Sequence, residues 1–144
     1  MLDLSLIRTR LADECASLNR VRIVADFDGV LGLQACNPSE AFVGGLNESP
    51  DENFALGAVS QRINVEFSVW IAVRRTVDAT LGEVWQSNLL TPRQEVITAL
   101  QDYEVSSDFS GLQQVSVGEV QQVSRHLAYW RMVWGCWYVE CNVI

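Results

Sequence analysis

A stretch of residues 61–75, QRINVEFSVWIAVRR, has a large apolar side chain at every second position from Ile63 to Val73. The apolar positions are Ile63, Val65, Phe67, Val69, Ile71 and Val73, and the positions facing the other way are Arg62, Asn64, Glu66, Ser68, Trp70, Ala72 and Arg74. Successive side chains of a strand point to opposite faces, so a period of two held this long predicts a half-buried strand. Such a strand is typical of an antiparallel sheet.

Weaker patterns before this stretch predict the elements of the first half. Apolar residues recur every three or four positions in residues 3–18, which predicts an amphipathic helix. Residues 21–26 and 40–45 are short apolar runs that indicate strands, and the segment 29–35 between them is ambiguous. Turn-forming and acidic residues dominate 46–58, which we expect to be a surface loop.

The second half begins with helical spacing over residues 77–103. Because Thr91-Pro92 has the form of an N-cap followed by proline at the first helical position, we expect two consecutive helices or one helix with a sharp kink. Residues 106–111 indicate a loop. Residues 112–124 and 129–144 then predict two strands joined near Arg125-His126.

The order of these elements favours one α+β domain covering residues 1–144. Strands and helices do not alternate regularly, as they would in a parallel α/β sheet. We therefore expect an antiparallel or mixed sheet with helices packed on one face. The unoccupied face of such a sheet needs another cover wherever it is apolar.

The C-terminal segment, YWRMVWGCWYVECNVI, is apolar on both faces of the predicted strand. One face must meet the helices, and we expect the other to lie in a subunit interface. The alternative, in which both faces belong to an internal core, would need a second covering layer. The candidate interface residues are Trp70, Arg74, Trp130, Arg131, Trp134, Trp137 and Tyr138. Trp134 or Trp130 is the expected anchor, with Arg74 or Arg131 near its rim, because tryptophan and arginine are common at binding hot spots.

Composition narrows the possible functions. The net charge of −8 argues against binding to nucleic-acid phosphates. The sequence has no lysine, which excludes mechanisms that depend on one. Neither an apolar run of membrane-spanning length nor a secretory signal is expected. The cysteines, Cys15, Cys36, Cys136 and Cys141, have no metal-binding spacing and are expected to be reduced; with one histidine, His126, the sequence predicts no metal site and no cofactor.

One motif suggests catalysis. VRIVADFDGVL, residues 21–31, resembles the first motif of haloacid-dehalogenase-type phosphatases, in which Asp26 would be the nucleophile and Asp28 the acid/base. The lysine and the later acidic metal motif of that family are absent. A turn after a strand explains the same residues, so the sequence predicts no enzyme, and a phosphatase remains only a remote alternative.

Four segments, taken in chain order, form a recognisable layout: VRIVADFDGVLGLQACNPSEAFVGG, RINVEFSVWIAVRR, LGEVWQSNLLTPRQEVITAL and LAYWRMVWGCWYVECNV. Together they resemble the tail terminator, or tail completion, proteins of tailed bacteriophages. The break at Thr91-Pro92 and the 112–124 strand depart from the pattern. The resemblance covers nearly the whole chain and rests on the layout of the segments more than on a specific motif.

The resemblance implies a structural protein of the virion, assembled in the host cytoplasm. Such a protein forms a homo-oligomeric, six-membered ring that caps the tail tube, ends tail polymerisation and offers a surface to neck or head-completion proteins. Genomic DNA would pass through the ring without specific binding, and no membrane is involved. Another tail or neck subunit of similar fold is the alternative.

Overall fold

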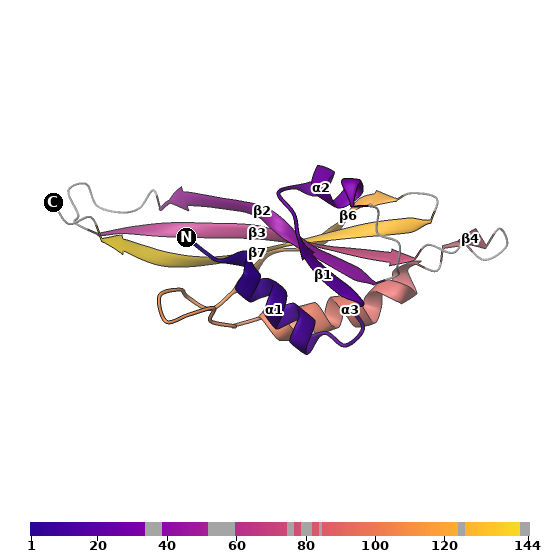
Figure 1. The fold of residues 1–144 in the computed structure, drawn as a ribbon, viewed down its shortest axis with the longest axis horizontal. Coiled ribbons are helices and arrows are strands. Elements are labelled where there is room, and N and C mark those ends of the chain that lie inside the picture. Colours follow the sequence, from indigo (N-terminus) through magenta and orange to yellow (C-terminus); the bar gives the residue numbers. More distant parts are fainter. Residues whose placement is uncertain are drawn as a thin grey trace.

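The structure, a computed structural model, describes residues 1–33, 39–51, 60–74, 77–78, 82–83, 85–123 and 126–141. These residues form a five-stranded mixed sheet, a two-stranded ladder and helices on both faces of the large sheet (Figure 1). In chain order the elements are α1 (Leu4–Glu14), β1 (Arg20–Ile23), α2 (Phe27–Gly32), β2 (Glu40–Pro50), β3 (Ser60–Arg74), β4 (Val77–Asp78), β5 (Gly82–Glu83), α3 (Trp85–Leu100), β6 (Gln113–Val123) and β7 (Leu127–Cys141). The large sheet has the order β1-β2-β3-β7-β6, with β1 parallel to β2 and the other neighbours antiparallel. The α+β class is confirmed.

The alternating stretch forms β3, the middle strand of the sheet, as predicted. It pairs with β2 on one side and, over its whole length from Ser60↔Cys141 to Arg74↔Leu127, with β7 on the other. Every odd-numbered residue from Ile63 to Val73 is buried. The sequence pattern therefore identified correctly the face on which the main core is built.

Helices α1 and α3 cover this face (Figure 1). The carboxylate of Asp3 caps α1 by accepting a hydrogen bond from the backbone N–H of Ser5 at 2.9 Å. The helix ends at Glu14, earlier than predicted, because the chain must turn to enter β1. Glu95 of α3 holds that turn, accepting hydrogen bonds from the N–H and hydroxyl of Ser17 at 3.0 and 2.6 Å.

The prediction for residues 77–103 is partly wrong. Pro92 lies inside the single helix α3, and Thr91 is not an N-cap. Proline removes one backbone donor, yet Leu89, Pro92 and Val96 are buried together on the inner side of the helix. Their burial offsets the lost hydrogen bond. The described residues just before α3 form the β4–β5 ladder instead of helix.

Strand β2 is longer than predicted, and Leu46–Pro50 is strand instead of loop. The long β3 provides backbone partners for this segment after a register shift between Gly44 and Asn47. Pairing thus overrides the local preference for turns. The rest of the predicted loop, residues 52–58, lies outside the described residues.

The ambiguous segment after β1 forms the short helix α2, which packs on the face opposite α1 and α3 (Figure 1). Asp26 caps it by accepting a hydrogen bond from the N–H of Gly29 at 3.0 Å. The expectation of helices on one face therefore holds for α1 and α3 but not for α2. The predicted 106–111 loop and the strands β6 and β7 are confirmed.

Two thiols are buried in the main core. Cys15 and Cys136 are free. Burial raises the pKa of Cys15 to about 12 and that of Cys136 to about 11, with nearby Glu95 and Glu48 acting in the same direction. Because of these raised pKa values, both thiols are protonated near neutral pH. The thiolate is the reactive form of cysteine, so both thiols should react slowly.

We expect alkylation at pH 8 to modify both thiols at least ~100-fold more slowly in the folded protein than in urea, because the raised pKa values remove the thiolate. Peptide mapping after a timed iodoacetamide pulse measures each cysteine separately. Equal labelling of Cys15 in the folded and unfolded protein would contradict its burial.

Within the described residues, no helix is both long and apolar enough to cross a membrane.

Candidate interaction surface

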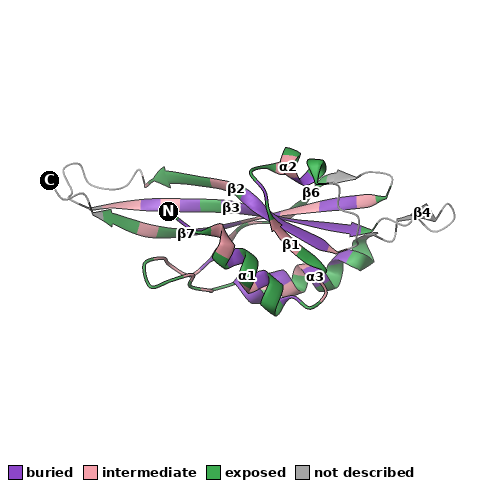
Figure 2. Ribbon diagram, viewed as in Figure 1, coloured by how far each residue is buried: buried purple, intermediate pink, exposed green. Residues whose placement is uncertain are grey.

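Helix α2 covers only part of its face of the sheet. The residues buried between α2 and the sheet are Val24, Val30, Phe42, Trp70, Ala72 and Tyr129. Phe27 closes this second cluster, with its ring 6.1 Å from that of Trp70 and 5.6 Å from that of Tyr129. Beyond the cluster, β2, β3 and β7 extend past α2, and much of that end is exposed (Figure 2).

The uncovered end of this face carries an apolar patch. We call it the Trp137 surface; it comprises Arg62, Glu66, Val115, Gly135, Trp137 and Val139. The exposed fractions are 55 % for Val115, 38 % for Trp137 and 46 % for Val139. Large apolar side chains this exposed and this close together are typical of interaction sites.

A glycine shapes the centre of the Trp137 surface. Gly135 pairs with both Glu66 of β3 and Gln113 of β6. A methyl group on Gly135 would lie only 2.9 Å from Cγ2 of Val115, so the valine occupies the space that a side chain would take. The result is an open groove of about 440 Å³ bounded by β3, β6 and β7.

Trp137 separates this groove from a second hollow of about 470 Å³, which is lined also by Met1, Asp108, Phe109, Tyr138 and Val139. The guanidinium of Arg62 lies 4.2 Å from the centre of the Trp137 ring, and its Nε is 3.7 Å from the carboxylate of Asp51. These contacts hold the indole in place. Trp137 is therefore a fixed aromatic group between two open hollows.

The charges around the Trp137 surface are mostly acidic. Arg62 is already paired with Asp51. Glu66 lines the groove and Asp108 lines the hollow, and neither carboxylate forms an ion pair with another described residue. The surface thus combines an apolar centre with unpaired negative charge.

Three of the predicted interface tryptophans pack within their own subunit. Trp134 has no exposed surface and packs in the main core, while Trp70 is 3 % exposed beneath α2. Trp130 is half-buried against the main core. Trp137, in contrast, points to the uncovered face.

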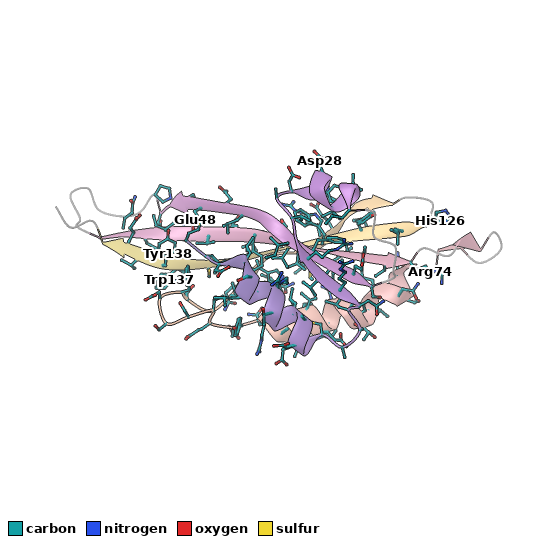
Figure 3. All side chains as sticks on the ribbon, viewed as in Figure 1. Asp28, Glu48, Arg74, His126, Trp137 and Tyr138 are labelled. Carbon is teal, nitrogen blue, oxygen red and sulfur yellow. The ribbon has the colours of Figure 1, made fainter. Side chains whose placement is uncertain are left out.

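Other predicted interface residues are bound to their own chain. Arg131 donates a hydrogen bond from Nε to the hydroxyl of Ser68 at 3.0 Å and lies 3.5 Å from a carboxylate oxygen of Glu119. The Tyr138 hydroxyl donates to Glu48 at 3.2 Å. Arg74 is exposed at the opposite end of the molecule from Trp137 and Tyr138 (Figure 3).

The residues of the phosphatase hypothesis have a structural explanation. Asp26 is the N-cap of α2, and Asp28 is an exposed residue of its first turn. Among the described residues, no group of three or more histidine, cysteine or acidic side chains is arranged to hold a metal ion. The exposed His126 immediately precedes β7 and lies at the same end of the molecule as Arg74 in Figure 3.

Sequence reasoning missed Val115, Val139 and Glu66. Val115 lies two residues after Gln113, which pairs with Gly135, so both side chains are on the groove face. Val139 and Glu66 lie in the same predicted strands as the candidate residues, but neither was selected. The alternation of β3 placed Glu66 on the side away from the core, and this was the available signal.

A comparison with protein families covers nearly the whole chain. Residues 1–140 match the model of the family described as phage tail terminator protein. The chain belongs to the phage tail terminator protein family. It is accordingly a structural protein of the phage tail, a virion component that interacts with other tail proteins. The terminator family is structural rather than enzymatic. A search of curated proteins found no match to this terminator.

Proposed function

We propose that this terminator forms a closed ring of six copies on the end of the finished tail tube. The ring ends tube polymerisation and presents its outer side to neck or head-completion proteins. The observation that carries the proposal is the Trp137 surface, because a tryptophan between two hollows on an uncovered sheet face is suited to burial against another subunit.

The proposed subunit interface retains Trp137 and Arg74. It excludes Trp134 and Trp70, which have almost no exposed surface. Trp130, Arg131 and Tyr138 are occupied by intrachain contacts and play at most a bordering role.

The charge supports passage of DNA through such a ring. A net charge of −8 repels the phosphate backbone, so a transiting genome would meet no strong binding site. The ring would assemble in the host cytoplasm as the tail is completed.

Light scattering on the purified protein tests the ring directly. A native mass near six times the 16.1 kDa chain mass is expected. Addition of this protein to growing tubes of the tail tube protein should stop their elongation. Open-ended polymers of the protein itself would favour a tube subunit, the alternative of similar fold, because only a closed ring ends growth.

A further inference from the structure

The two ends of the sheet carry complementary features. At one end the Trp137 surface is apolar and holds the unpaired carboxylate of Glu66, and the adjoining hollow holds that of Asp108. At the other end Arg74 is exposed, and the side-chain amide of Asn88 in α3 donates a hydrogen bond to its carbonyl at 2.9 Å. Figure 3 shows Arg74 and Trp137 at opposite ends of the molecule.

The Arg74 end also has an exposed apolar group and a second cation. Leu90, two residues beyond Asn88 in α3, is 69 % exposed. Arg20 is exposed at the start of β1, where its register partner Glu40 is buried and paired with Arg22 at 3.2 Å. We define the Arg74 surface by Arg20, Arg74 and Leu90. None of its guanidinium groups forms an ion pair with a described residue.

From this pairing of surfaces we propose a head-to-tail contact between copies of the chain, in which the Arg74 surface of one subunit binds the Trp137 surface of the next. Leu90 would pack against the apolar centre, and Arg74 and Arg20 would face Glu66 and Asp108. The inference rests on the proposed ring and specifies which surfaces close it.

Head-to-tail contacts have a consequence that a two-fold contact lacks. A patch that binds itself stops at a dimer, whereas two different patches on one chain generate a ring when the rotation between copies closes. The two proposed surfaces lie at opposite ends of β3, so this chain has two different patches and is suited to a ring. The intersubunit charge pairs would also select the order of the surfaces, because like ends repel.

One-sided variants test this arrangement. Val139→Glu places a charge in the Trp137 surface, and Leu90→Glu places one in the Arg74 surface; both positions are exposed, so both proteins should fold. Each variant alone is expected to be monomeric. An equimolar mixture should form a dimer of twice the chain mass and nothing larger, because only one intact pair of surfaces remains.

A charge exchange gives a second readout. Glu66→Arg and Arg74→Glu should each abolish the ring alone, whereas their mixture should restore its full mass, since every contact then joins opposite charges. Leu6→Glu, at a 44 % exposed position on α1 outside both surfaces, is the matched control and should leave the mass unchanged.

The outcomes separate the two proposals. If the unmodified protein forms a ring but the mixed variants remain monomeric, the head-to-tail assignment is overturned and the ring stands. Loss of the ring in Leu6→Glu would overturn the choice of surfaces as well. If the unmodified protein is monomeric at every concentration, both proposals fail.

Discussion

Replacing Trp134 with alanine is expected to lower the free energy of unfolding by about 3–5 kcal/mol, the usual cost of deleting a large buried aromatic side chain. Trp134 has no exposed surface and is the largest fully buried side chain among the described residues. It faces Phe67 across the β3–β7 pair and contacts the core beneath α1 and α3. Removing the indole leaves a cavity that the paired strands are too constrained to close.

Urea unfolding followed by circular dichroism measures this loss, with Trp137→Ala as the control. That change should lower monomer stability by less than about 1 kcal/mol, because it removes an exposed ring and its contact with Arg62. It should weaken assembly by more than about 2 kcal/mol if Trp137 is a hot spot. The comparison is made at the lowest workable protein concentration, since assembly adds to apparent stability. A Trp134→Ala protein that is stable but does not assemble would show that Trp134 belongs to the subunit interface.

Replacing Gly44 with alanine is expected to cost about 3–5 kcal/mol, from overpacking and from hydrogen bonds lost at the β1–α2 junction. A methyl group at Gly44 would overlap the carbonyl group of Val24. The neighbouring backbone is held by hydrogen bonds from Val24 N–H to the Val43 carbonyl and from Gly45 N–H to the Ala25 carbonyl, at 2.9 and 3.0 Å. The junction would have to move away from β2 and lose these bonds.

Gly32→Ala is the matched control for this change. Gly32 ends α2, and beyond its chain neighbours and the backbone of its own helix no described heavy atom lies within 4 Å of the position that its methyl group would take. Its effect on unfolding should be smaller than about 1 kcal/mol. Equal midpoints for the Gly44 and Gly32 variants in the same urea titration would show that the β1–α2 junction moves freely.

The sequence predicted the parts of the fold that one strong local pattern determines. The alternation in β3 gave both the strand and its buried face. In β7, by contrast, both faces are apolar, and nothing local distinguishes Trp134 from Trp137. Pairing with β3 makes the distinction, because Trp134 lies opposite Phe67 and Trp137 opposite Asn64. Register is a tertiary property, so the interface was expected to include residues from both faces.

Other differences between the predicted and the observed fold also arise from tertiary packing and strand pairing. Pro92 is a strong signal for a helix start, yet packing of the inner side of α3 extends the helix across it. Leu46–Pro50 contains turn-forming residues, yet β3 offers a partner strand beyond Gly44. The groove beside Trp137 depends on the pairing of Gln113 with Gly135, which brings Val115 over the glycine. This register is a tertiary property that no periodicity in residues 112–124 indicates.

The unbroken pairing of β3 with β7 also makes this strand a spacer. Its 15 residues extend for roughly 50 Å, at about 3.3 Å per residue. Both proposed contact surfaces are attached to it, the Trp137 surface through Arg62 and Glu66 and the Arg74 surface through Arg74. A hydrogen-bonded strand in the middle of a sheet resists both stretching and compression. In a head-to-tail ring, the diameter would then be set by the residue count of one strand, and loops elsewhere in the chain could change length without altering its fit to the tube.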